Sequence, residues 1–237
     1  APHVETSAGI ILPDDYISQM AAAAHEVGAL MVLDCIASGC IWVDMAATGV
    51  DVMISAPQKG WSASPSAGVV VLSPAAEARL AETVSNSFAL DLKKWRAIME
   101  TYEKGGHAYH ATMPTDAIVG FRDAMVETKL MGFEAAKAAQ WALGRAVRGM
   151  LAAKGVASVA AEGFQAPGVV VSYTSDPDVQ SGSKFRAEGL QIAAGVPLQV
   201  GEGAEFKTFR LGLFGLDKLK DVDATVARLG RAVDAVL

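Results

Sequence analysis

The sequence predicts an α/β fold in the first part of the chain and a smaller α+β unit after it. Short, mostly apolar runs at 29–33, 50–54 and 68–72 are separated by segments that carry helix signals. Such runs are typical of strands buried on both faces, as in a mostly parallel sheet covered by helices. From about residue 131, an alanine-rich helical pattern followed by alternating strand and helix signals indicates the second unit.

The first helix is marked at both ends. Pro13, Asp14 and Asp15 open an apolar-periodic run that reaches Val27, and Gly28 follows it. Pro and acidic residues in a first turn, and Gly just past a last turn, are the usual start and stop signals of a helix. We therefore expect this run to be helical.

The three apolar runs are the expected strands. Asp34 ends the first, and Ser73 with Pro74 stops the third, after which residues 75–84 have a helical pattern. Between 85 and 114, glycines and a proline interrupt a polar and aromatic stretch, so irregular structure is expected there.

The remaining elements define the second unit, and we place the boundary near residue 130, giving domains 1–130 and 131–237. A helix begins at Thr115 or Asp116 and runs towards Met125. The elements expected after it are helices at 131–154, 181–189 and 221–236 and strands at 168–174 and 206–213.

Composition excludes several classes of function. The 237 residues are 51% apolar and 19% charged, which is too apolar for a disordered chain. A net charge of -6 offers no basic field for nucleic acid, and no apolar run approaches the roughly 20 residues of a membrane span. Two cysteines, Cys35 and Cys40, cannot form a disulfide framework, and no leader pattern opens the sequence. A cytoplasmic protein is expected.

Lys59 is the first candidate for chemistry. It lies in the cluster Ser55–Trp61, directly after a predicted buried strand, where open α/β folds bind ligands. A lysine in such a place can act as a nucleophile that forms a Schiff base once its amine is desolvated. The alternative is an ordinary solvated loop lysine.

Asp34 is the second candidate. It ends a predicted apolar strand, and a carboxylate there needs a cationic or donor partner. Pyridoxal phosphate enzymes pair an Asp with the pyridine nitrogen while a Lys holds the aldehyde as an imine. The alternative is an Asp that caps the following turn.

Five segments carry a family resemblance. In order and approximate spacing, the chain resembles the class V aminotransferases, most closely the alanine-glyoxylate and serine-glyoxylate group of fold type I pyridoxal phosphate enzymes. The match spans the whole chain. The segments are His3-Val4-Glu5-Thr6-Ser7-Ala8-Gly9, Val32–Ser38, Ser55-Ala56-Pro57-Gln58-Lys59, Tyr109-His110-Ala111-Thr112-Met113-Pro114 and Phe209-Arg210-Leu211-Gly212-Leu213.

The resemblance implies roles for the cofactor-binding residues. Lys59 would form the aldimine and then move a proton between the substrate alpha carbon and the cofactor. Asp34 would hold the pyridine nitrogen, Ser7 would approach the phenolic side of the ring, and Gln58 would bind the phosphate. The implied cofactor is pyridoxal 5'-phosphate.

The resemblance also implies a shared active site and a substrate clamp. Tyr109 and Thr112 would reach the phosphate bound by a neighbouring subunit, so a homodimer is implied. Arg210 would grip the substrate carboxylate with its planar guanidinium, whereas without the resemblance it is an ordinary strand arginine. His3 is a further contact in the motif. His107 and His110 resemble a metal pair, but no third ligand lies nearby, and no metal is expected.

The implied activity is transfer of an amino group from a small amino acid, alanine or serine-like, to a 2-oxo acid such as glyoxylate or pyruvate. Family members carry roughly a further third of chain ahead of the His3 motif, with a Gly-rich phosphate loop and a ring-stacking aromatic residue. Two alternatives stay open: a lyase or desulfurase of the same fold, and a truncated, non-catalytic interaction module.

Overall fold

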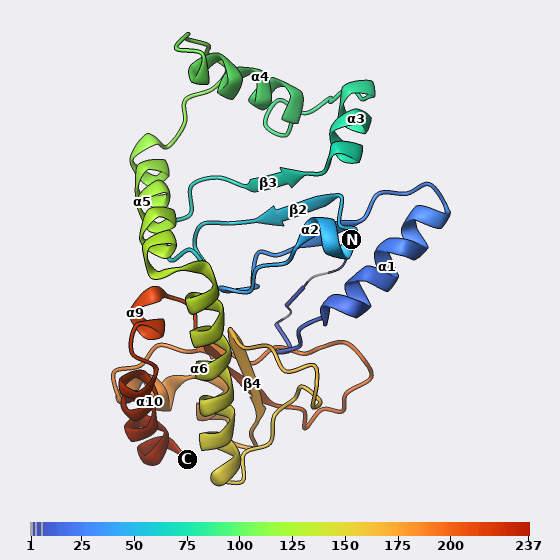
Figure 1. Cartoon of the computed structure of the whole chain (residues 1–237). Coiled ribbons are helices and arrows are strands. Elements are labelled where there is room, and N and C mark those ends of the chain that lie inside the picture. The colour runs from blue at the N-terminus through green and yellow to red at the C-terminus, as the bar shows by residue number, and fades with distance from the viewer. Residues whose placement is uncertain (1, 3, 6) are drawn as a thin grey trace.

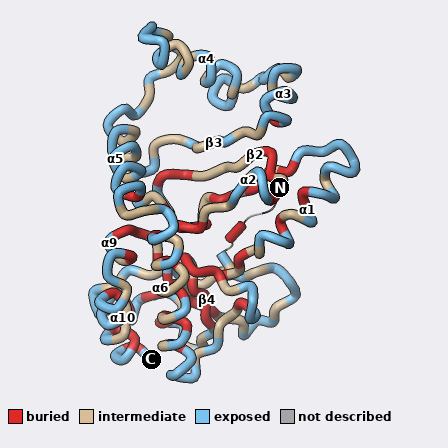
Figure 2. The backbone as a smooth tube through the Cα atoms, in the orientation of Figure 1, coloured by how far each residue is buried: buried red, intermediate tan, exposed pale blue. Residues whose placement is uncertain are grey.

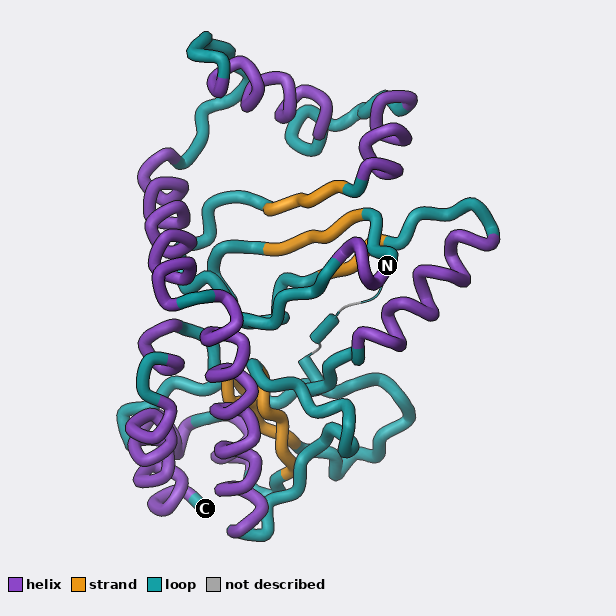
Figure 3. Tube along the Cα trace, in the orientation of Figure 1, coloured by secondary structure: helices purple, strands orange, loops and turns teal. Residues whose placement is uncertain are grey.

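The computed structural model describes residue 2, residues 4–5 and residues 7–237, and it consists of two layered units joined by long helices (Figure 1). His3, one of the motif residues, lies outside the described residues. Helices surround the strands of the first unit, whereas in the second unit helices lie on one side of the strands and loops on the other (Figure 3).

The first unit contains a mixed sheet. Within the described residues its strand order is β1-β2-β3. The expected parallel pairing holds for β1 and β2, with Asp34 opposite Ile54, whereas β3 runs antiparallel to β2 because a loop rather than a helix connects them. The elements are α1 (Asp14–Glu26), β1 (Val32–Asp34), α2 (Met45–Thr48), β2 (Val52–Ser55), β3 (Val69–Leu72) and α3 (Pro74–Glu82).

A buried carboxylate links the beginnings of β1 and β2 to the end of the antiparallel strand β3. Asp51 is 5% exposed, and its Oδ2 accepts hydrogen bonds from Met31 N at 2.8 Å and lies 2.7 Å from His25 Nε2. Ser73 Oγ donates to Oδ1 at 3.2 Å. Burial raises the pKa of Asp51, but these hydrogen bonds outweigh it and the pKa lies below its usual value. One side chain therefore links α1, β1, β2 and the residue after β3.

The expectation of irregular structure from 85 to 114 is wrong for its middle. Residues Leu92–Glu103 form helix α4, whose N-cap Asp91 accepts a hydrogen bond from Lys94 N at 3.1 Å. An ion pair between Arg96 and Glu100, one turn apart, supports it on the solvent side. The next helix, α5 (Thr115–Met131), begins where expected and runs beyond Met125 to Gly132, whose φ of 92° separates it from α6 (Phe133–Ala153).

The second unit packs an antiparallel sheet against α6, and α10 packs on α6. Its strand order within the described residues is β4-β6-β5. The helix expected at 181–189 is two short helices, because Gly182, with a φ of 79°, breaks it. The elements are β4 (Val169–Tyr173), α7 (Pro177–Ser181), α8 (Ser183–Ala187), β5 (Ala193–Ala194), β6 (Thr208–Gly212), α9 (Leu216–Leu219) and α10 (Val222–Val236).

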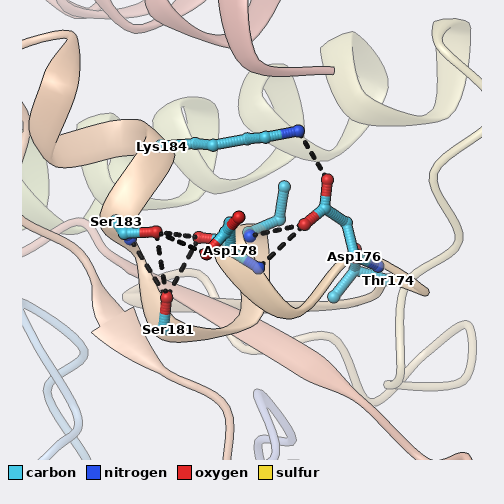
Figure 4. Close-up of polar contacts among 7 residues, drawn as sticks. Thr174, Asp176, Asp178, Ser181, Ser183 and Lys184 are labelled. Carbon is cyan, nitrogen blue, oxygen red and sulfur yellow. Dashed lines mark hydrogen bonds and ion pairs between the residues drawn. The ribbon is translucent and has the colours of Figure 1, made fainter.

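Polar contacts fix the break between α7 and α8 (Figure 4). Asp176 caps α7 by accepting from Asp178 N at 2.8 Å, and its other oxygen lies 2.5 Å from Lys184 Nζ on α8. Helix α7 also contacts the end of β5: Gly195 N, just after that strand, donates a hydrogen bond to Gln180 O at 3.2 Å.

Buried residues form two clusters, one in each unit (Figure 2). The first includes Ile17 and Leu33, and the second includes Leu143, Phe185 and Phe209. The boundary near residue 130 stays a prediction. No helix among the described residues is long and apolar enough to span a membrane.

Candidate functional site

Asp34 and Lys59 lie at the same edge of the first sheet. Asp34 is the last residue of β1, and Lys59 follows the end of the parallel strand β2 by four residues. Because parallel strands point their carboxyl ends to one edge, both residues lie at the edge where open α/β folds bind ligands.

The turn that carries Lys59 is held tightly. Ser62 N donates to Lys59 O, and Ala63 N donates to Pro57 O, both at 3.0 Å. Ser62 has a φ of 58°, in the left-handed region that a serine rarely adopts. Gly60 lies against the loop after β1: a Cβ there would stand 2.2 Å from Gly39 O. Only glycine lets the two loops approach so closely.

Phe214 connects this turn to the second unit. Lys59 is half-buried, and its Nζ lies 5.6 Å from the centroid of the Phe214 ring, within cation–π range. The same ring touches the start of β4, since a Cβ on Gly168 would lie 2.9 Å from it. The lysine is thus directed towards the boundary between the two units.

Asp34 is half-buried, and its Oδ1 accepts a hydrogen bond from Ile36 N at 2.9 Å. The turn-capping contact anticipated as the alternative for this residue is therefore present. It fixes the orientation of the carboxylate at the sheet edge.

Arg210 lies on the central strand of the second sheet. Its backbone pairs with Val171 on one side and Ala193 on the other, and its Nε donates to Ala194 O at 2.8 Å. It precedes Phe214 by four residues, so their Cα atoms are at most about 14 Å apart. The strand that carries Arg210 therefore leads into the segment whose Phe214 ring lies beside Lys59.

The other predicted cofactor residues lie on the surface. Ser7 and Gln58 are exposed. Tyr109 is 71% exposed, and its hydroxyl lies 3.3 Å from Thr112 Oγ1 in the segment before α5. Their roles at the cofactor stay predictions.

The two cysteines are poorly suited to nucleophilic chemistry. Burial and the nearby charge of Asp34 raise the pKa of Cys35 to about 12, and burial raises the pKa of Cys40 to about 11. The thiolate is the reactive form, so both side chains are protonated near neutral pH.

Glu5 was not singled out from the sequence, although it lies in the first motif. It is 2% exposed, its Oε1 accepts from Gly168 N at 3.2 Å, and its Oε2 has no hydrogen-bond partner among the described residues. Burial raises its pKa to about 8 against the opposing effects of backbone hydrogen bonds and Arg148. The signal that could have found it is a lone acidic residue beside the apolar Val4.

The residues present fit pyridoxal phosphate by their chemistry. A lysine amine that can attach an aldehyde and a carboxylate that can pair with a ring nitrogen converge on one sheet edge. Among the described residues, no three metal-ligating side chains lie together as a group. A lysine and an aspartate placed in this way are typical of α/β proteins that bind pyridoxal phosphate.

The chain belongs to the class V aminotransferase family. The model of that family matches residues 1–187, which is most of the chain. Curated relatives include the 2-aminoethylphosphonate–pyruvate transaminases of Burkholderia ambifaria, 30% identical over 99% of this chain and 61% of that protein, and of Paraburkholderia phymatum, 29% identical over 98% and 60%. The chain thus spans about 60% of the length of these relatives.

Solved structures confirm the fold class. The alanine–glyoxylate aminotransferase from Nostoc sp. superposes with a TM-score of 0.81 at 20% identity, over 99% of this chain and 60% of that one. The pyridoxamine–pyruvate aminotransferase from Mesorhizobium loti gives a TM-score of 0.76 at 23% identity, over 99% and 59%.

Gly60→Ala is expected to disturb the lysine turn. The added Cβ would overlap Gly39 O, so one of the two loops must shift, and urea unfolding should show a loss of about 1–3 kcal/mol. Gly68→Ala is the matched control, because nothing lies within 4 Å of the added Cβ there. Equal stability of the two variants would show that the close approach of the loops is not a constraint.

Glu5→Gln is expected to stabilise the protein at alkaline pH. With a folded pKa of about 8 against 4.5, wild-type stability falls as pH rises from about 4.5 and the whole penalty is present above 8. Gln keeps the oxygen that accepts from Gly168 N and removes the charge. The difference in unfolding free energy should therefore grow from near zero at pH 4 to the order of 3–5 kcal/mol at pH 9.

Urea titrations at several pH values measure this difference, with the exposed Glu103→Gln as control. A constant difference across the pH range would mean that Glu5 ionises at its ordinary pKa.

Proposed function

We propose that this chain is the lysine-bearing part of a pyridoxal phosphate-dependent aminotransferase. The observation that carries the proposal is the convergence of Lys59 and Asp34 at the carboxyl edge of adjacent parallel strands. Membership of the class V aminotransferases supports it.

The acceptor we propose is a small 2-oxo acid, pyruvate or glyoxylate. Pyruvate is named in the relatives from Burkholderia and in the structural neighbour from Mesorhizobium, and glyoxylate in the neighbour from Nostoc. The amino donor we propose is a small amine such as alanine or serine. The relatives that name 2-aminoethylphosphonate make that compound a donor to test beside them.

Lys59, Asp34 and Arg210 each have a separate role in the proposed reaction. Bound pyridoxal phosphate supplies an aldehyde and an electron-withdrawing ring. Lys59 attaches the cofactor and, once released, holds and returns the proton at the substrate alpha carbon. Asp34 stabilises positive charge on the ring nitrogen, and Arg210 binds the substrate carboxylate.

The peripheral roles are proposed from the family likeness. Ser7 and Gln58 hold the ring and the phosphate. Tyr109 and Thr112, exposed before α5, reach the cofactor of a second subunit in a cytoplasmic homodimer. Their exposure leaves them accessible to a partner.

A desulfurase or lyase that depends on cysteine is less well supported. Burial raises the pKa of both thiols well above neutrality, so neither is a ready nucleophile. A non-catalytic module would not require Lys59 and Asp34 to share an edge.

Lys59→Ala should abolish cofactor attachment and turnover in the complete protein. Borohydride reduction after incubation with pyridoxal phosphate, followed by peptide mass spectrometry, should place the adduct on Lys59 of the wild type. Amino transfer to pyruvate by the variant should fall by at least about a thousandfold, because one amine both attaches the cofactor and moves the proton. Lys104→Ala, an exposed lysine at the end of α4, is the control. An adduct on another lysine would overturn the proposal.

Arg210→Ala should weaken amino-acid capture by roughly 2–5 kcal/mol, seen as a raised KM, because a charge-assisted pair with the substrate carboxylate is lost. Arg210→Lys should recover part of this loss, since it keeps the charge without the planar fork. Arg186→Ala, an exposed arginine on α8, is the matched control. Unchanged kinetics for Arg210→Ala would remove the role assigned to it.

A further inference from the structure

The ring of Phe214 lies against backbone that three glycines leave bare. A Cβ on Gly168, just before β4, would lie 2.9 Å from Phe214 Cε1, and one on Gly39, in the loop after β1, would lie 3.5 Å from its Cδ1. A Cβ on Gly212, the last residue of β6, would lie 3.9 Å from Cδ2. Three segments that are distant in sequence therefore pass beside the ring, and a side chain at Gly168 would push it aside.

The backbone that carries Phe214 is fixed on both sides. Leu213 N donates to Gly168 O at 2.8 Å, and the buried Gln140 of α6 donates from its Nε2 to Leu213 O at 3.3 Å. On the other side Gly215 has a φ of 117°, in a region that favours glycine, and helix α9 begins at the next residue. The second unit therefore holds the ring in place.

The amine that this ring meets belongs to the first unit. Lys59 Nζ lies over the Phe214 ring, 5.6 Å from its centroid. Among the described residues, no carboxylate or carbonyl oxygen is paired with Lys59 Nζ. An aromatic face carries partial negative charge and attracts an ammonium group electrostatically. The ring is thus the described group that holds the charged end of the lysine.

A hold of this kind suits a lysine that has to move. An ammonium over an aromatic face is held far less firmly than one paired with a buried carboxylate. A lysine that attaches a cofactor and later moves a proton must leave its resting place and return to it. An ion pair would oppose each departure, whereas a ring face keeps the amine in place and releases it readily.

We propose that Phe214 is a positioning residue for Lys59. Its ring holds the end of the lysine side chain whenever the amine is not attached to the cofactor, and it stabilises the amine while the amine carries the proton. The inference rests on the proposed function, because it gives the ring a task in the steps of Lys59. The second unit then contributes to those steps through Phe214 as well as through Arg210.

Fluorinated phenylalanines at position 214 test the contact directly. Monofluoro-, difluoro- and trifluorophenylalanine keep nearly the shape of the ring and progressively withdraw negative charge from its face. The complete protein without cofactor is treated with acetic anhydride at constant pH, and peptide mass spectrometry compares acetylation of Lys59 with that of the exposed Lys104. Because only the neutral amine reacts, acetylation of Lys59 should quicken stepwise, by about two- to fivefold with trifluorophenylalanine.

Phe214→Leu and Phe214→Tyr are the encoded counterparts. Leu keeps apolar bulk and removes the ring, so it should raise the acetylation rate of Lys59 as trifluorophenylalanine does, whereas Tyr should match the wild type. Phe164→Leu, at an exposed phenylalanine in the loop before β4, is the matched control. In amino transfer Phe214→Leu should lower kcat by about two- to fivefold and leave the KM for the amino acid unchanged, because Arg210 is untouched.

The two measurements separate this inference from the aminotransferase assignment. Borohydride fixation of pyridoxal phosphate on wild-type Lys59, together with equal acetylation rates across the fluorinated series, would overturn the inference alone. A kcat that Phe214→Leu leaves unchanged would overturn it as well. Absence of fixation on wild-type Lys59 would overturn the proposed function, and with it the task of the ring, even where the acetylation rates rise.

Discussion

The site depends on the alignment of β1 with β2, and a single buried carboxylate sets that alignment. Asp51 binds the backbone N–H of Met31 through its side chain, while its own N–H donates to Met31 O at 2.9 Å. These two contacts pin the beginnings of both strands. A slip of one residue would turn every side chain to the other face of the sheet. Such a slip in β1 would turn the Asp34 carboxylate to the opposite face of the sheet.

A second constraint joins the N-terminal motif to the strand of Arg210. Glu5 accepts from Gly168 N, and Gly168 O accepts from Leu213 N at 2.8 Å. Leu213 follows β6, and the next residue is Phe214, whose ring lies beside Lys59. A continuous path of hydrogen bonds and ring contact therefore runs between the two units. Movement of one unit changes the surroundings of the lysine.

Much of this could be predicted from the sequence, and the failures have physical causes. Lys59 and Asp34 were found because apolar runs ended at polar residues. The α4 helix was missed because none of its residues is buried, so its cap and ion pair stabilise it rather than a core. The antiparallel β3 was missed because period and composition do not encode strand direction. Glu5 and Phe214 depend on contacts between segments more than 160 residues apart.

Arg148 and Arg210, both in the second unit, show that two residues of the same type have different roles because their environments differ. Arg210 donates a hydrogen bond from its Nε to Ala194 O, and this contact restrains the guanidinium. Arg148 does the reverse: a terminal nitrogen holds backbone carbonyls, and its buried Nε has no hydrogen-bond partner among the described residues. The half-exposed guanidinium of Arg210 can exchange bound water for a substrate carboxylate, whereas the guanidinium of Arg148 lost its water when it was buried on folding. The half-exposed Arg210 suits a substrate that must leave, whereas the buried Arg148 joins the two backbone segments that it bonds.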